Sequence, residues 1–351
     1  MNDTIILNDR QQQIIDLLSR GNSPLGRDDI AIHVDASKPT IIRDLNSLEQ
    51  FGLVLRIGDG PSTGYKLANT SRLLKYIDKE EYFNADPMGR DLITQDDHEL
   101  FDVLENEDLI NDVEKARLNS INQEFIVRRD KMPPDGMRRD IERFTIELAW
   151  KSSAIEGNTY TLLETEELIK NLRVADGKTV PETQMILNHK KALDVILTHR
   201  KDYKNIRLSD VIDIHSALVD NLGVTGGIRS QSVGITGTKY APIDNRFQLT
   251  ERMERLIDVV NKKDHPVEKA LILSGMIAYL QPFMDGNKRT ARLMANAVLV
   301  GNDFSALSYR AVSDIEYKKA VLLIDEQHNF YWYKKIFIDQ FIDAAENYFA
   351  I

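Results

Sequence analysis

The feature that most constrains this chain is a short polar segment between two long apolar stretches. Residues 281–292 read QPFMDGNKRTAR. Residues 267–280, just before them, are apolar almost all round, as in a buried helix, and residues 293–300, just after them, are again nearly all apolar. The pattern predicts two buried helices joined by a loop that carries a proline, a glycine, a carboxylate and two arginines.

The residues of this loop favour binding of a phosphate. A helix beginning near Asn287 would offer unpaired backbone N–H groups and the positive end of its dipole. Arg289 and Arg292 are three residues apart, so they would share one face of the first turn and could grip two phosphate groups. Asp285 could hold Mg²⁺ together with phosphate oxygens. An ordinary buried loop with an Asp–Arg pair remains the structural alternative.

The same segment resembles the signature of the Fic/Doc family, His-Pro-Phe-x-Asp-Gly-Asn-Gly-Arg-x-x-Arg. Most members transfer AMP from ATP to a protein hydroxyl, whereas the Doc branch transfers a phosphoryl group. The resemblance therefore implies ATP or another nucleoside triphosphate as ligand, Mg²⁺ bound by Asp285, and a Ser, Thr or Tyr hydroxyl of a protein target, or of the chain itself, as acceptor. It also implies a nucleotide-binding set consisting of Gly286, Asn287, Lys288, Arg289 and Arg292.

Two positions of the segment depart from the family signature. Gln281 stands at the position of the catalytic histidine, and a glutamine amide does not titrate, so it cannot act as a general base. Lys288 replaces the glycine of most members, although the Doc branch also has lysine there. The expected protein is thus a nucleotide-binding relative of the adenylyltransferases with impaired or absent catalysis. AMP transfer and Doc-like phosphate transfer both remain open.

A second motif lies on a predicted helix over residues 141–157. Glu156 falls in the last turn of this helix, where a carboxylate opposes the helix dipole and calls for a cationic partner. Together with Ser152 and Gly157 it resembles the family's inhibitory motif, Ser/Thr-x-x-x-Glu-Gly/Asn. The resemblance implies that Glu156 pairs with Arg292 and blocks the γ-phosphate position. An exposed glutamate at an ordinary helix end is the alternative.

Residues 1–68 predict a separate small domain. Three helical stretches are followed by two short strand-like runs around the glycine-rich segment 58–63. This is the order of a winged helix-turn-helix, and residues 37–48 resemble the recognition helix of DeoR-type regulators. In a DNA-binding version, Lys38, Thr40 and Arg43 would face the major groove. Contacts to the DNA backbone would come from the wing residues Arg56, Thr63 and Lys66.

The net negative charge of this domain weakens the interpretation that it binds DNA. It contains seven basic and nine acidic residues, and the whole chain has a formal net charge of −10. A winged helix used for dimerisation or protein contact is the alternative. The protein would then be a non-enzymatic regulator with its other domain as a sensor or dimerisation body.

Residues 226–243 differ from the helical remainder, because Val233 and Ile235 alternate with small residues between glycines. They predict a short hairpin, which resembles the family's flap that holds a target segment by strand addition. The residues expected to contact the target are Ser232, Val233, Gly234, Ile235 and Thr236. His215, on a predicted helix over residues 208–222, is expected to be a packing residue.

These observations give a mainly α fold: a Fic-type helical bundle with a short β-hairpin flap, plus an N-terminal winged helix. The expected domains are residues 1–68, a helical connecting segment at 69–135, and a Fic domain at 136–351. The absence of cysteine, of a leader-like N-terminus and of any apolar run of about 18 residues suggests a cytoplasmic protein without membrane partners. A homodimer is also expected.

Overall fold

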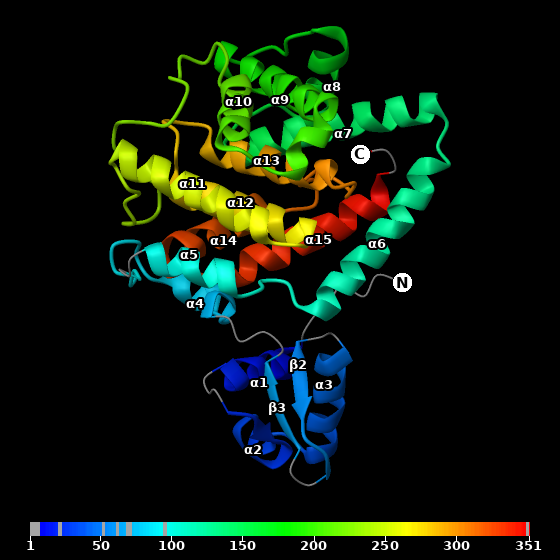
Figure 1. Ribbon diagram of the computed structural model, residues 1–351, viewed down its shortest axis with the longest axis vertical. Coiled ribbons are helices and arrows are strands. Elements are labelled where there is room, and N and C mark those ends of the chain that lie inside the picture. The colour runs from blue at the N-terminus through cyan, green and yellow to red at the C-terminus, as the bar shows by residue number, and fades with distance from the viewer. Residues whose placement is uncertain are drawn as a thin grey trace.

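The computed structural model describes residues 8–19, 23–50, 53–60, 63–67, 72–93, 97–348 and 351. Within these ranges the chain is mainly helical with one small sheet, as expected from the sequence (Figure 1). No helix of the described ranges is both long and apolar enough to cross a bilayer. The boundary expected at residues 68–69 and residues 61–62 of the glycine-rich segment lie outside the described residues.

The N-terminal part contains three helices and a three-stranded antiparallel sheet with the strand order β1-β3-β2. Its apolar residues form their own buried cluster, separate from the main core, and on α3 Ile41, Leu45 and Leu48 point inward because they are spaced three or four residues apart. The elements are α1 (Asp9–Ser19), β1 (Leu25–Gly26), α2 (Arg27–His33), α3 (Lys38–Gln50), β2 (Val54–Ile57) and β3 (Gly64–Leu67).

The helical order and the β2–β3 hairpin follow the sequence prediction, whereas the two-residue strand β1 was not predicted. One predicted wing contact is wrong. Thr63 is buried, and its hydroxyl donates to the carbonyl of Gly60 (2.8 Å), so it closes the turn and cannot reach a DNA backbone. Arg56 is exposed and Lys66 is partly exposed.

The connecting region is helical but more broken than predicted. Asp78 accepts hydrogen bonds from the backbone N–H groups of Glu80 and Glu81 (both 3.0 Å) and caps a new helix within it. The elements of this region are the 3₁₀ helix η2 (Arg72–Leu74), α4 (Lys79–Asn84), α5 (Asp97–Asn106) and α6 (Asp112–Asp130).

The remaining helices form a bundle around α12 (Figure 1). Every residue of α12 from Val267 to Leu280 is buried, which agrees with its nearly continuous apolar sequence, and α13 packs along it. The elements are α7 (Pro134–Ile155), α8 (Leu162–Asn171), α9 (Val180–Thr198), η3 (Arg200–Lys204), α10 (Leu208–Leu218), α11 (Arg246–Lys262), α12 (Pro266–Leu280), α13 (Asn287–Gly301), α14 (Asp314–Gln327) and α15 (Tyr331–Asn347).

Helix α7 begins earlier than predicted, at Pro134 rather than at residue 141. Residues 133 and 134, which precede the predicted start, are both proline. A proline is well tolerated at the first helical position, however, since its missing N–H would be unpaired there in any case. The helix therefore spans Pro134–Ile155, and Glu156 is its C-cap.

The hairpin predicted within residues 226–243 is not formed, since this described segment contains no strand. It is held instead by Arg229, whose side chain donates to the carbonyls of Gln231 (2.8 Å) and Ile243 (2.5 Å). A buried guanidinium satisfies the carbonyls that strand pairing would otherwise have used. The fold class holds, but its predicted β-hairpin flap is a loop.

Candidate functional site

The polar segment 281–292 forms a tight turn between α12 and α13. Gln281 ends α12 in the left-handed conformation (φ 48°), and its side-chain amide donates back to the carbonyl of Ala278 (2.5 Å). Asn287 closes the turn, because its side-chain oxygen accepts from the N–H of Phe283 (2.8 Å) and its amide nitrogen donates to the carbonyl of the same residue (2.8 Å). The Asn287 side chain therefore supports the loop, and its expected contact to a phosphate would have to come from its backbone N–H.

Gly286 occupies the N-cap of α13 with a left-handed backbone (φ 81°). A Cβ atom at this position would lie 3.2 Å from a methyl group of Val219, so the conformation and the space both favour glycine. Because the N-cap residue Gly286 has no side chain, it does not cover the backbone N–H groups at the start of α13.

Arg289 and Arg292 are both buried, with 2% and 0% of their surface exposed. Arg289 donates through Nη2 to Asp285 Oδ2 (3.1 Å), and burial lowers the pKa of its guanidinium. Its Nη1 is buried and makes no hydrogen bond to any described residue. An unpaired guanidinium nitrogen at a helix N-terminus is a costly arrangement unless an anion uses it.

Arg292 forms the ion pair with Glu156 that the family resemblance implies. Its Nη2 donates to Glu156 Oε1 (2.8 Å) and to the backbone carbonyl of Ser152 (2.8 Å), and its Nε donates to Ser152 Oγ (2.8 Å). Burial lowers its pKa, but the Glu156 carboxylate outweighs this and the net shift is upward. Nη1 lies in the interior beside the Tyr317 ring without a well-formed hydrogen bond.

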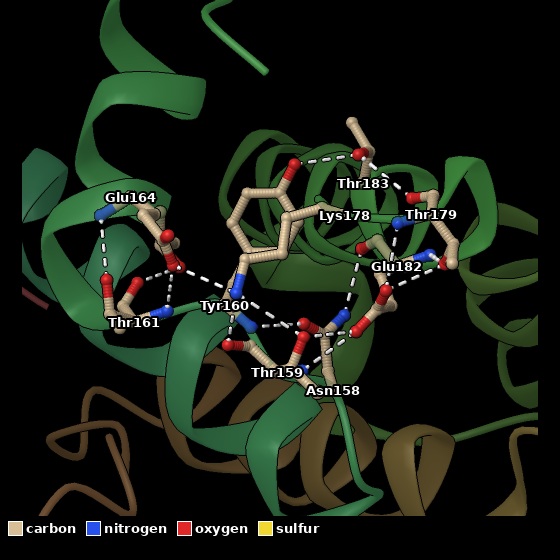
Figure 2. A network of polar contacts seen from close by, with 10 residues as sticks. Asn158, Thr159, Tyr160, Thr161, Glu164, Lys178, Thr179, Glu182 and Thr183 are labelled. Atoms are coloured by element: carbon tan, nitrogen blue, oxygen red, sulfur yellow. Dashed lines mark hydrogen bonds and ion pairs between the residues drawn. The ribbon is translucent and has the colours of Figure 1, made fainter. Parts of the chain in front are cut away.

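The strap of residues 157–161, which follows Glu156, is tied to the N-terminus of α9 (Figure 2). Glu182 Oε1 accepts from the N–H (3.1 Å) and the hydroxyl (2.6 Å) of Thr159, while its Oε2 accepts from the N–H (2.9 Å) and the hydroxyl (2.8 Å) of Thr179. These hydroxyl and N–H contacts lower the pKa of Glu182 to about 2. Lys178 adds a bond from its ammonium to the carbonyl of Thr159 (2.6 Å).

Three residues around the loop were missed or undervalued by sequence reasoning. Arg229 donates through Nε to the carbonyl of Gln281 (2.6 Å) and through its backbone N–H to the carbonyl of Pro282 (2.9 Å). His215 stacks on Phe283 at 3.7 Å between ring centroids and contacts the carbonyl of Asp285 through Nε2 (3.0 Å). The third is His189, which bonds to the hydroxyl of Ser152 (2.9 Å). No spacing in the sequence connects these three residues to the loop.

The other predicted residues are distributed as follows. Lys288 is half-buried at the start of α13, and Gly157 is exposed with φ 94°, just after Glu156. Ser232, Gly234 and Thr236 are exposed, and Val233 and Ile235 are half-buried, in the loop that Arg229 holds. On α3, Lys38 and Arg43 are exposed and Thr40 is half-buried, and none of the three belongs to the loop at α13.

The residues present fit a magnesium ion only together with phosphate oxygens. Among the described residues, no group of three or more His, Cys, Asp or Glu side chains could hold a metal ion alone. The Asp285 side chain is 66% exposed, with Oδ1 accepting from the N–H of Gly286 (2.6 Å). Because Mg²⁺ is commonly held by one or two carboxylates plus substrate phosphates, Asp285 is a suitable single protein ligand.

Comparison with known proteins supports these expectations for part of the chain. Residues 205–299, from just before α10 to the end of α13, match the model of the Fic/DOC family. The protein adenylyltransferase Fic of Nematostella vectensis is 28% identical over 211 residues, which cover 57% of this chain and 48% of that protein. The protein adenylyltransferase fic-1 of Caenorhabditis elegans is 22% identical over 215 residues, covering 60% and 42%. The chain thus spans about half the length of these curated relatives.

Two solved structures show the same fold. Fic-1 (residues 134–508) of C. elegans superimposes with a TM-score of 0.56 at 22% identity and covers 67% of this chain and 69% of that one. A signalling protein from Bacteroides thetaiotaomicron described as containing a Fic domain superimposes with a TM-score of 0.57 at 19% identity, covering 66% and 94%.

Proposed function

Because residues 205–299 of this chain form a Fic/DOC family domain, we propose that the loop at the start of α13 binds ATP with Mg²⁺. The observation that carries this proposal is the pair of buried arginines, Arg289 and Arg292, each with an Nη1 atom that lacks a well-formed hydrogen bond. In this proposal Arg289 holds the inner phosphates, Arg292 meets the γ-phosphate, and Asp285 holds the metal ion.

In this proposal Glu156 inhibits the binding of ATP by the same chain. The carboxylate occupies Nη2 of Arg292, so a γ-phosphate must either displace it or accept a poorer position. The strap after Glu156 favours this closed arrangement, because Glu182 and Lys178 anchor it to α9. ATP should therefore bind weakly to the wild-type protein.

Calorimetric titration with Mg-ATP tests the inhibitory role. Glu156→Gly should bind ATP about tenfold more tightly than wild type, since a charge-assisted hydrogen bond of about 1.5 kcal/mol no longer competes. Glu142→Gln is the matched control, because Glu142 lies on the same helix in an exposed contact with Lys170 and should leave affinity unchanged. Equal affinity of wild type and Glu156→Gly would remove Glu156 from the site.

We further propose that AMP transfer to a protein hydroxyl is impaired at Gln281. In such a transfer the target oxygen attacks the α-phosphorus, the bond to pyrophosphate breaks, and a base takes the hydroxyl proton. Gln281 cannot take this proton, and its amide is turned back to the carbonyl of Ala278. Loss of a general base typically costs about 10²- to 10⁴-fold in rate. Some transfer can persist, because positioning carries much of the rate in phosphoryl chemistry.

The test is Gln281→His in the Glu156→Gly background. This variant should modify itself or a lysate protein well above wild type, with α-³²P-ATP and γ-³²P-ATP used in parallel. Label from the α-position alone indicates AMP transfer, whereas label from the γ-position alone indicates the Doc-like phosphotransfer that Lys288 could favour. If wild type is as fast as the restored variant, the missing-base assignment is wrong.

The exposed polar face of α3 favours DNA binding as a second function. Lys38 and Arg43 are exposed there, on the third helix of a helix–helix–helix–hairpin arrangement that has its own core. In this proposal the N-terminal part is a winged helix and the Fic domain acts as a sensor or dimerisation body. Lys38 is paired with exposed Asp28 (2.9 Å), which a phosphate would have to replace.

Mobility-shift measurements on a genomic-fragment library test this second function. Wild-type affinity should fall steeply with salt, and Lys38→Ala/Arg43→Ala should lose binding, because both cations would release counterions from the DNA. Absence of any shift at low salt would favour the protein-contact alternative for α3.

A further inference from the structure

We propose that His189, on α9, is a positioning residue that orients Arg292 through the hydroxyl of Ser152. The inference rests on the proposed function in one respect, namely that Arg292 faces the outer phosphates of a bound nucleotide. It assigns to Ser152 a role in building the phosphate site, separate from the inhibitory role of Glu156 in the same motif.

The three side chains form a continuous buried chain of hydrogen bonds. His189 and Ser152 have 1% and 0% of their surface exposed, and Arg292 has 0%. Arg292 Nε lies 2.8 Å from Ser152 Oγ, and Ser152 Oγ lies 2.9 Å from His189 Nε2. At the far end, His189 Nδ1 lies 2.9 Å from the carbonyl of Met185, with a longer contact to Ser153 Oγ (3.3 Å). The chain thus joins the backbone of α9 to the guanidinium on α13.

The direction of each hydrogen bond follows from what each atom can do. A guanidinium only donates, so Arg292 Nε–H donates to Ser152 Oγ. The Met185 carbonyl only accepts, so His189 carries its proton on Nδ1 and donates there. His189 Nε2 is then an acceptor, and the Ser152 hydroxyl proton is directed at it. Each donor and acceptor of the chain is used once, with the imidazole neutral.

A charged imidazole would break this chain. With protons on both nitrogens, His189 would present a donor to Ser152 Oγ, and the Ser152 hydroxyl proton would lose its acceptor. Burial, together with the positive charges of Arg289 and Arg292, lowers the pKa of His189 to about 3. His189 therefore keeps its accepting nitrogen throughout the neutral range.

The contacts of Ser152 and Glu156 with Arg292 overlap at Nη2, but Ser152 alone also holds Nε, and this separates their roles. Ser152 holds Nε through its hydroxyl and Nη2 through its carbonyl, whereas Glu156 contacts Nη2 alone. Removing Glu156 leaves the Nε edge of the guanidinium anchored and frees part of the donor capacity of Nη2 for a phosphate. The orientation of Arg292 consequently depends on α9 even when the inhibitory carboxylate is absent.

The experiment compares nucleotide binding in the Glu156→Gly background with and without His189→Phe. Phenylalanine keeps a ring in the space but removes both nitrogens, so Ser152 loses its acceptor. Mg-ATP affinity should fall about 10- to 100-fold, the range expected for a lost hydrogen-bond partner of a charged group. AMP lacks the outer phosphates, so its affinity should stay within about twofold. His189→Gln, whose amide oxygen can replace Nε2 as acceptor, should recover part of the ATP affinity.

Controls separate positioning from general packing. Ser152→Ala interrupts the same chain at its middle and should give the same loss for ATP over AMP. His265→Phe replaces another buried histidine, bonded to Asn119 through Nε2 (3.2 Å) and remote from Arg292 in the fold, and should leave both affinities unchanged. Unchanged ATP binding in His189→Phe, or equal losses for ATP and AMP, would overturn the proposal.

A nucleotide-free measurement keeps the inference testable apart from the proposed function. With ¹⁵N-arginine labelling, Arg292 Nε–H should give a slowly exchanging resonance that His189→Phe makes fast-exchanging and His189→Gln retains. If Glu156→Gly binds no nucleotide, the proposed function fails, and this resonance decides the positioning role alone. An Arg292 Nε–H resonance that exchanges as slowly in His189→Phe as in wild type would overturn the positioning role of His189.

Discussion

The start of α13 has two arginines three positions apart, and α3 has two basic residues five positions apart, yet the surroundings of the two pairs differ. Arg289 and Arg292 are buried, and their partners come from α7 and from the loop before α13. Lys38 and Arg43 are exposed, and both partners of the Lys38–Asp28 ion pair are exposed as well. Buried cations must be oriented by the protein, whereas exposed cations are oriented by water or by a ligand. The first region should therefore respond strongly to single changes and the second weakly.

Acidification should produce the largest difference between the two regions. Burial lowers the pKa of His189 to about 3 and those of His215 and His265 to about 4, whereas His33 of the N-terminal part is exposed. Below pH 6.5 the unfolded chain binds protons that the folded chain cannot, so this stability is fully present above pH 6.5 and falls as pH decreases. At pH 5.5 the loss is about 1.4 kcal/mol for each buried histidine, and buried Asp325 offsets part of it, because burial raises its pKa well above the usual range.

Urea unfolding at pH 7.5 and 5.5, followed by tryptophan fluorescence, measures this effect. Both tryptophans, Trp150 on α7 and Trp332 on α15, report on the bundle rather than on the N-terminal part. Limited proteolysis within residues 8–67 should change little over the same pH range. A midpoint at pH 5.5 that is no lower than the midpoint at pH 7.5 would contradict this expected net loss of stability.

Replacement of a single arginine should give the next largest difference in stability between the two regions. Arg229→Met removes the donors for three backbone carbonyls, of Gln281, Gln231 and Ile243, and should lower the free energy of unfolding by about 3 kcal/mol. Arg43→Met, on the exposed face of α3, should change it by less than about 0.5 kcal/mol. Thermal melts of both variants give the comparison. Equal shifts would show that burial of Arg229 does not stabilise the loop.

Loosening the strap after Glu156 should have a smaller effect, on binding rather than on stability. Glu182→Gln replaces one of the two accepting oxygens with a donor that faces Thr159 or Thr179, so Glu156 should be held less firmly. Mg-ATP affinity should rise about two- to fivefold, below the tenfold expected for Glu156→Gly. Glu166→Gln, in an exposed i,i+4 pair with Lys170 on α8, is the matched control. If Glu182→Gln binds ATP like wild type, the strap does not support the inhibitory contact.

The smallest effect should come from the exposed pair on the N-terminal part. Lys38→Ala removes the Lys38–Asp28 contact and should alter the free energy of unfolding by less than about 0.5 kcal/mol, because exposed ion pairs are screened by solvent. A clear destabilisation would show that this face is structural and would count against its use as a ligand surface.

Local patterns of apolar residues in the sequence determined much of the helical structure. The apolar runs around residues 281–292 predicted α12 and α13, since a helix that is apolar all round must be buried, and α13 begins at Asn287 as expected. The apolar spacing of α3 predicted an inward face of Ile41, Ile42, Leu45 and Leu48. Three of these residues are buried, whereas Ile42 is exposed. The Glu156–Arg292 pair could be predicted only because two separate motifs resembled parts of one family, since the two residues are 136 positions apart.

Tertiary structure alone decided how the loop is supported. Arg229, His215 and His189 belong to three separate segments and carry no sequence pattern that links them to residues 281–292, because their partners are backbone carbonyls and a hydroxyl. Any residue offers such carbonyls, so recognition depends on distance and direction and not on residue type. The missing hairpin is a similar case. The alternation at Val233 and Ile235 is compatible with strands, but the buried guanidinium of Arg229 bonds to the carbonyls of the same segment at Gln231 and Ile243.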